Sequence, residues 1–256
     1  MISKRILALA KPFILSFAAI FLLSLAQEAR ADEVFIEGHT GACFATESMP
    51  CQPPNTGGAP QTATFLGLTY SNSTFRGVTA NGFLAFGGDP AAPPAQNLNN
   101  FGSLFLDQAV AATYDGTDIR LRLVFTAPQG IGDPSRVFVA DIIGTVRSDE
   151  SGGIRIDFPS EINNTGMLFT FNDTNCEPNP LPGQAPPGQT VTCGQGSFLL
   201  RINDVSINPG QTASVTGDID AAQQTTIPEP ATLLLLGTGL TGVAAGVRRR
   251  RKAAQK

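Results

Sequence analysis

Between residues 62 and 219 the chain alternates apolar and polar side chains in short runs, which is the period of a β-strand with one buried face. Residues 119–126 carry Ile, Leu, Leu and Phe at every second position. The same period is present at residues 64–70, 82–86, 103–106, 136–146, 154–158, 167–171, 198–203 and 212–219. Gly, Pro, Asn and Asp separate the runs, and no helical period extends beyond a few turns. The pattern predicts an all-β fold, an antiparallel β-sandwich with jelly-roll-like order.

The N-terminal residues have a different pattern. Three positive residues, Lys4, Arg5 and Lys11, precede an apolar run at residues 12–26, which is the order of a secretory signal peptide. Ala29 and Ala31 supply the small side chains that a signal peptidase accepts on either side of one bulky residue. We therefore expect cleavage before Asp32, with Ala26 as the competing site.

The C-terminal residues hold a second membrane signal. Pro228, Glu229 and Pro230 precede an apolar stretch at residues 231–247, and a basic cluster follows at once, made of Arg248, Arg249, Arg250, Arg251 and Lys252. Seventeen helical residues rise about 25 Å, which is at the short end of what spans a hydrocarbon core of about 30 Å. Because Lys and Arg stay on the cytoplasmic side, a single transmembrane helix would leave everything before Pro228 outside. An ordinary anchor that stays uncut is the alternative reading.

The order of triplet, apolar span and arginine cluster at the C-terminus resembles the PEP-CTERM sorting domain. The resemblance implies recognition by an exosortase, a membrane-embedded Cys transpeptidase that cuts near the triplet, and release to the cell surface or the extracellular matrix. Two prolines hold the triplet extended and out of the helix, which keeps it open to an enzyme. The body also resembles choice-of-anchor modules through Asn81-Gly82-Phe83 and the run at residues 102–106.

These signals divide the chain into a signal peptide (1–31), an extracytoplasmic β-sandwich domain (32–217), a linker (218–227) and a sorting segment (228–252). Residues 32–61 and 178–189 have the composition of loops. Residues 32–227 carry 19 acids, seven arginines and no lysine, a net charge of −12 against −4 for the whole chain. Phosphate contacts need clustered Lys and Arg, so an acidic body without a basic patch argues against binding to nucleic acid and to anionic lipid surfaces.

The four cysteines fall as two local pairs, Cys43 with Cys51 and Cys176 with Cys193. In an exported protein an even number of cysteines indicates disulfides. Four cysteines allow three connectivities. Local pairing is preferred because each local bond would close a loop that has little core of its own.

Few residues offer catalytic chemistry. The single histidine, His39, lies close to the predicted mature N-terminus, where a mobile segment is expected, and no nucleophile or phosphate-binding motif is present. Paired carboxylates such as Glu150, Asp157 and Glu161 would suffice for a glycosidase, but nothing singles them out among the other acids.

Asp115 and Asp118 flank a glycine turn and are weak candidates for Ca²⁺ ligands. Such turns are far more often plain hairpin loops, so we predict no cofactor, with Ca²⁺ as the exception to test.

Taken together, the sequence predicts an exported bacterial protein that is not an enzyme. Its expected partners are signal peptidase and exosortase during export and an extracellular polysaccharide afterwards, and its membrane contact is through the C-terminal helix before processing. The expected location is an inner-membrane intermediate, then the cell surface or an exopolysaccharide or biofilm matrix. The alternatives are a secreted glycan-binding module, calcium-dependent or not, and a glycosidase.

Overall fold

The computed structural model of the protein describes residues 33–91, 97–174 and 194–221, which all lie in one compact unit, Ala31–Gln224. This body is built of strands, with a single π-helical turn, η1 (Glu161–Thr165), among the described residues. The all-β class predicted from the period-two runs is confirmed. Apart from a two-residue parallel pairing of β4 with β6, the described strand pairs are antiparallel.

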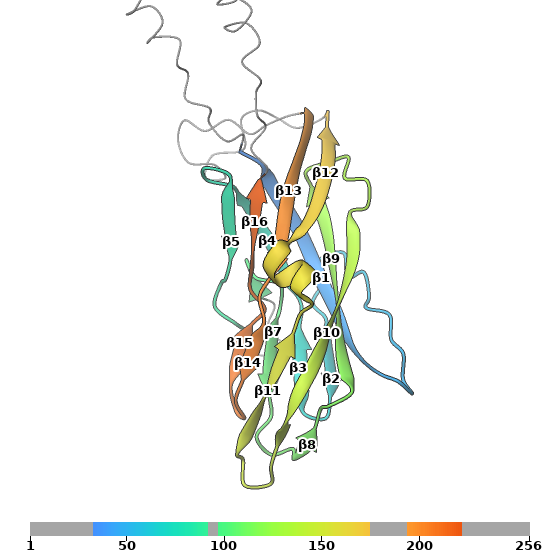
Figure 1. Cartoon of the computed structure of the whole chain (residues 1–256), viewed down its shortest axis with the longest axis vertical. Helices are drawn as coiled ribbons and strands as arrows, with labels where there is room; N and C mark the ends of the chain where they lie inside the picture. Colours follow the sequence, from blue (N-terminus) through green and yellow to red (C-terminus); the bar gives the residue numbers. More distant parts are fainter. Residues whose placement is uncertain (1–32, 92–96, 175–193, 222–256) are drawn as a thin grey trace, which may run out of the picture. The chain divides into compact units, whose positions relative to one another are not determined.

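The largest sheet has eight strands and contains the two longest, β1 and β10 (Figure 1). Its order is β14 (Val205–Ile207), β11 (Gly152–Asp157), β10 (Ser135–Val146), β9 (Thr117–Ala127), β1 (Phe35–Thr46), β4 (Ser73–Val78) and β6 (Asn97–Leu98), with β8 (Ala112–Thr113) beside β10.

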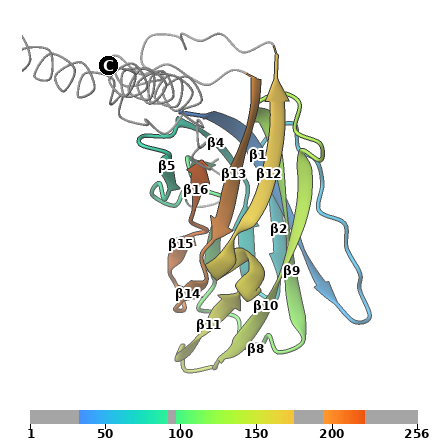
Figure 2. The ribbon, with the colours of Figure 1, turned by 45° about the horizontal axis from the view of Figure 1, so that its top comes forward.

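Two four-stranded sheets complete the body. One has the order β12 (Met167–Asp173), β13 (Gly194–Ile202), β16 (Gly217–Ala221) and β5 (Phe83–Phe86). The other has the order β15 (Thr212–Ser214), β7 (Ser103–Leu106), β3 (Leu68–Ser71) and β2 (Thr62–Phe65). The sheet of β12, β13, β16 and β5 lies across the β1, β4 and β9 part of the large sheet (Figure 2), and side chains of the two sheets meet between them.

The inward row of each predicted strand is buried as its alternation indicates. Ile119, Leu121 and Leu123 in β9 are at most 1% exposed, and the alternating residues of β11 and β13 are buried in the same way. Burial of apolar side chains at about 25 cal/mol per Å² is the main favourable term for such a body. One continuous core therefore joins the three sheets.

Seven phenylalanines form a connected cluster between the sheets, with ring centroids 4.9 to 6.3 Å apart: Phe75, Phe86, Phe101, Phe125, Phe169, Phe171 and Phe198. Most of these pairs are edge-on or tilted, the geometry that the ring quadrupole favours. Glycines make room for several rings. A Cβ at Gly38 would collide with the Phe75 ring, and one at Gly196 with the Phe171 ring.

The predicted loop at residues 32–61 is in part wrong, because β1 occupies residues 35–46 and lies between β9 and β4 in the large sheet. The strand was hidden by Gly38 and Gly41, which indicate a loop in sequence. In the structure both glycines are close-approach positions: a Cβ at Gly41 would meet the backbone oxygen of Pro54. The mobile segment expected around His39 is therefore a central strand.

The predicted linker boundary at residue 218 is also wrong. Residues 217–221 form β16, which pairs with β13 on one side and β5 on the other. Ile219 is fully buried between Asp218 and Asp220, so the alternation that marks a strand continues past the predicted domain end. The run at residues 64–70 is likewise divided, into β2 and β3, by a turn at Leu66 and Gly67 with positive φ at both residues.

Within the described residues, no helix has the length and apolar character that crossing a membrane would need. The predicted transmembrane stretch at residues 231–247 lies outside them.

Candidate functional site

Most of the site residues named from the sequence lie outside the described part of the chain. They are the sorting residues Pro228, Glu229 and Pro230, the basic cluster at residues 248–252, the signal-peptidase residues Ala29 and Ala31, and the second cysteine pair, Cys176 and Cys193. The structure does describe the parts of the body nearest to these segments. Glu33 and Ala221, the first and last described residues, are both held by hydrogen bonds.

The body begins at Glu33, whose carboxylate is buried against the turn that joins β4 to β5. Glu33 Oε2 accepts a hydrogen bond from the Thr79 hydroxyl at 2.7 Å, and Oε1 accepts one from the Asn81 amide at 2.8 Å. Val34 then pairs with Thr79 through its own backbone. The second residue after the predicted cleavage site is thus part of the fold.

The last described residue of the body, Ala221, lies next to the same turn. The Ala221 amide donates to the Gly82 carbonyl at 2.6 Å, directly beside the Asn81–Gly82 corner that Glu33 caps. Asn81 and Gly82 both have positive φ, as a two-residue hairpin turn requires. Glu33 and Ala221, the first and last described residues, therefore lie at one corner of the body, beside the Asn81–Gly82 turn.

The Cys43–Cys51 disulfide is confirmed and fastens a loop to the outer side of the large sheet. This covering loop, residues 47–61, follows β1. Arg120 donates from Nη1 to the Cys51 carbonyl at 3.2 Å, and Arg122 donates from Nε to the Pro53 carbonyl at 2.8 Å. The loop is therefore held by the disulfide and by two arginines of β9.

His39 is a structural residue of this region. It is 7% exposed, and its Nε2 lies 2.8 Å from Asn55 Oδ1 in the covering loop. The neighbouring Thr40 hydroxyl lies 2.8 Å from the Tyr70 hydroxyl, which donates to the Phe101 carbonyl, and burial raises the pKa of Tyr70. A catalytic histidine needs access to substrate, and this one is turned to the loop that covers it.

The two weak calcium candidates have different neighbours. Asp115 Oδ1 accepts a hydrogen bond from the Gly144 amide at 3.1 Å. Asp118 lies in β9 directly opposite Asp141 of β10, and burial together with that like charge raises the pKa of Asp118. Among the described residues, no three His, Cys, Asp or Glu side chains are grouped as a metal site would require.

The carboxylates named for a glycosidase are dispersed. Asp157 is bound to Arg155 at 2.9 Å, and Arg155 also contacts Asp204. Glu150 lies in the turn between β10 and β11 with positive φ, and Glu161 begins η1. Asp157 is thus engaged in an ion pair, while the other two lie in separate connections.

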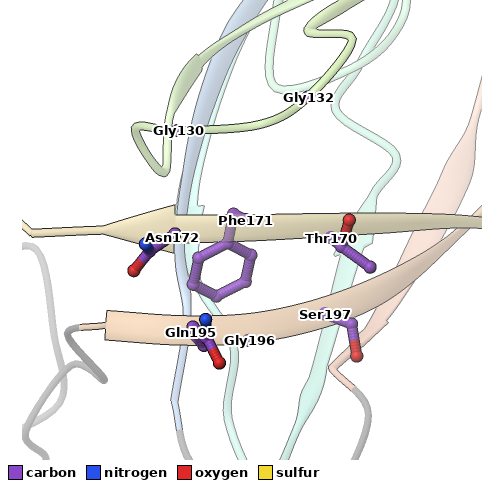
Figure 3. A pocket seen from close by; sticks show the side chains of 8 residues that line it. All are labelled: Gly130, Gly132, Thr170, Phe171, Asn172, Gln195, Gly196 and Ser197. Carbon is purple, nitrogen blue, oxygen red and sulfur yellow. The ribbon is translucent and has the colours of Figure 1, made fainter.

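An open pocket of about 480 Å³ lies where the loop between β9 and β10 meets β12 and β13 (Figure 3). It is lined by Gly130, Gly132, Thr170, Phe171, Asn172, Gln195, Gly196 and Ser197. The loop is attached to β12 by two hydrogen bonds, from the Gln129 amide to Asp173 and from the Asn172 amide to Gly130. Hydroxyl and amide side chains provide the polar part of this lining, and none of its side chains is charged.

The polar side chains of the pocket come in facing pairs. Thr170 lies opposite Ser197, and Asn172 lies opposite Gln195, with the Phe171 ring between the two strands (Figure 3). The pattern of the sequence gives no sign of this pocket. The polar positions that alternate with Phe169 and Phe171 indicate only the solvent side of a strand, and their partners come from a strand that begins 21 residues after β12 ends.

Comparison with known proteins assigns one segment of the chain. The PEP-CTERM protein-sorting motif matches residues 226–251, which include the Pro-Glu-Pro triplet, the apolar stretch and the arginine cluster. No curated protein and no solved structure matches the chain. The chain therefore carries a PEP-CTERM protein-sorting motif, the mark of an exported protein that is held at the membrane and then sorted by an exosortase.

Proposed function

We propose that the β-body is a non-catalytic module that the sorting motif delivers to the cell surface or into an extracellular polysaccharide matrix. The observation that carries the proposal is the PEP-CTERM motif at residues 226–251, which follows a body whose last described strand ends at Ala221. A sorting tail this close to a folded domain makes that domain the delivered cargo.

The chemistry of the body supports a role without catalysis. The single histidine of the chain is buried in β1 and bound to Asn55. The net charge of −12 over residues 32–227 keeps such a body soluble among acidic polymers, since like charges repel. The proposed architecture is a β-sandwich in which the sheet of β12, β13, β16 and β5 forms one layer and the large sheet the other.

The sorting part of the proposal is tested by the mature C-terminus. Expressed in a host that carries an exosortase, the wild-type chain should reach the surface without residues 248–256. Glu229→Ala should leave an uncut protein in the inner membrane, because the apolar stretch is unchanged and only recognition is lost. Mass determination after fractionation measures both outcomes.

Replacing Arg248 to Arg251 together by Ser is the matched comparison. Each buried arginine opposes translocation by about 2.5 to 3.5 kcal/mol, so this variant should insert poorly or slip through the membrane. A surface protein that retains residues 248–256 in wild type and both variants would show that the tail is a permanent anchor.

A second candidate function is glycan binding, which the pocket beside Phe171 favours. Sugars are recognised through hydroxyl groups, and the hydroxyls and amides of Thr170, Ser197, Asn172 and Gln195 offer both donors and acceptors. The absence of charge in the lining favours a neutral sugar over an acidic one.

Glycan binding is tested on an array of neutral and acidic polysaccharides, with and without EDTA. Asn172→Ala combined with Gln195→Ala should abolish binding, whereas Asn208→Ala, which changes an exposed asparagine in the turn between β14 and β15 and outside the pocket lining, should not. Loss of glycan binding in EDTA would show that the binding depends on calcium. Release of reducing ends that depends on a carboxylate would establish a glycosidase instead. Binding that survives the double variant would remove the pocket from consideration.

A further inference from the structure

The place where the chain leaves the body limits how far the body can lie from a membrane. Residues 222–230 separate Ala221 from the apolar stretch that begins at residue 231. Nine residues span at most about 30 Å even when fully extended. While the apolar stretch is in the membrane, the surface around Ala221 is therefore within about one bilayer thickness of the lipid headgroups.

The surface around Ala221 is partly apolar. Phe83 of β5 lies opposite Asp220, the residue before Ala221, and its side chain is 48% exposed. Across the sheet the same row continues through Leu199 to Leu168, which is 58% exposed. Phe83, Leu199 and Leu168 thus form an apolar row on the outward face of β5, β13 and β12.

The acids beside this row are neutralised in part. Asp220 interrupts the row, and Arg201 binds both Asp220 at 2.5 Å and Asp218 at 2.8 Å. Glu33, at the same corner of the body, is buried and hydrogen-bonded. One arginine shared by two carboxylates leaves a net charge of −1 beside the apolar row, much less than the net charge of the body as a whole.

We propose that, before the tail is cut, the apolar row of Phe83, Leu199 and Leu168 lies against the phospholipid surface of the membrane that holds the tail. The tether supplies the proximity, and exposed Phe and Leu side chains are those that interfacial protein surfaces insert below the headgroups. The contact depends on apolar area, so it does not require anionic lipid. The inserted tail itself places the Pro228-Glu229-Pro230 triplet at the membrane surface, and the contact would keep the folded body beside it there; the inference rests on insertion of the tail.

The chain contains no tryptophan, so a single introduced indole reports its own surroundings. Phe83→Trp, Leu168→Trp and Ile143→Trp each place one indole on an exposed apolar position. Ile143 is the matched control, because it lies near the turn between β10 and β11 at the opposite end of the body from β5 (Figure 1). The full-length uncut chain is reconstituted in vesicles of phosphatidylethanolamine and phosphatidylglycerol, with and without brominated acyl chains.

Brominated lipid should lower the emission of Phe83→Trp and Leu168→Trp roughly twofold, as expected for side chains below the headgroups, and leave Ile143→Trp unchanged. Sedimentation with the vesicles shows separately whether the tail inserts, so a failure of sorting is distinguishable from a failure of docking. Inserted protein with equal quenching at all three positions, or with none, would overturn the proposal. Two results together would also overturn the proposal: slow cutting of a Phe83→Ser variant in cells, and no quenching of the Trp variants in vesicles of lipid alone. They would indicate that the row contacts the exosortase and not the lipid.

Discussion

The phenylalanine cluster and the covering loop are held in place by different forces. The cluster joins two sheets through the contact of seven rings, with glycines opposite several of them. The covering loop has little apolar interior and is attached through individual bonds, among them the Cys43–Cys51 disulfide, the carbonyl contacts of two arginines and the Asn55 contact with His39. Buried apolar area is contributed by many residues of the cluster, whereas a hydrogen bond is lost completely when one of its two partners is removed.

Truncating the cluster should have the largest effect. Phe198→Ala removes a fully buried ring that contacts Phe125, Phe169 and Phe171. The loss of area and the cavity left behind should lower the free energy of unfolding by about 3 to 5 kcal/mol, measured by urea denaturation of the mature body. Phe83→Ala, on the exposed side, is the control and should change it by less than about 0.5 kcal/mol. Equal losses of stability in Phe198→Ala and Phe83→Ala would show that the cluster does not stabilise the core.

Removing the disulfide is the next largest change. Cys43 and Cys51 are eight positions apart, so Cys43→Ser with Cys51→Ser releases a short loop and should lower the free energy of unfolding by about 2 to 3 kcal/mol. The covering loop should also become sensitive to protease while the strands stay protected. Mass mapping under non-reducing conditions checks the bond itself. Free thiols at both positions in the exported protein would contradict the structure here.

A single hydrogen-bonding residue under the loop should have a smaller effect. Arg122→Met keeps much of the side-chain volume but removes the bonds to the Pro53 carbonyl and the Ser135 hydroxyl, and should cost about 1 kcal/mol. Arg136→Ala is the matched control, because its pair with Asp133 is about half exposed and surface pairs contribute little. The proposed role of Arg122 fails if both variants have the same stability.

The smallest expected effect is a gain in stability, from a substitution on the outer face of the large sheet. Asp118→Asn removes the repulsion from Asp141 and should stabilise the body at neutral pH by less than about 1 kcal/mol. The raised pKa of Asp118 means that the folded state binds its proton more tightly than the unfolded state. Wild-type stability is therefore lost as pH rises from the ordinary Asp range through the raised pKa.

Urea denaturation across that pH range tests this sign. The variant and the wild type should have similar stabilities at low pH, where Asp118 is protonated, and should diverge above it. A difference that is constant with pH would show that the substitution acts through packing and not through charge.

The strands that sequence predicted best are those with large apolar residues on one face, such as β9 and β13, because burial and period coincide there. Sequence failed at β1, where Gly38 and Gly41 are needed for close approach and resemble loop residues. Close approach is a property of the facing segment, Phe75 of β4 for Gly38 and the Pro54 carbonyl for Gly41, and no local pattern records it. The division into three sheets likewise depends on pairings between distant segments.

The site was predicted unevenly for a related reason. The sorting motif is a local signal, read by a membrane and an enzyme along consecutive residues, so sequence alone identified it and the comparison agrees. The Cys43–Cys51 bond was also local. The pocket beside Phe171 and the apolar row at Phe83 are assembled from separate strands, and only the strand register brings their members together.

The position of β16 has a consequence for the timing of export. This strand lies in the middle of its sheet, between β13 and β5, although it is the last described strand of the chain. A chain that crosses the membrane from its N-terminal end delivers β16 last, so β5 and β13 have to wait unpaired along those edges until residue 221 emerges. Long-range pairings of this kind form slowly compared with local ones. Because the sorting motif follows within a few residues, we expect the last strand pairings to form at about the time the tail reaches the membrane, so that the cargo completes its fold before the tail is cut.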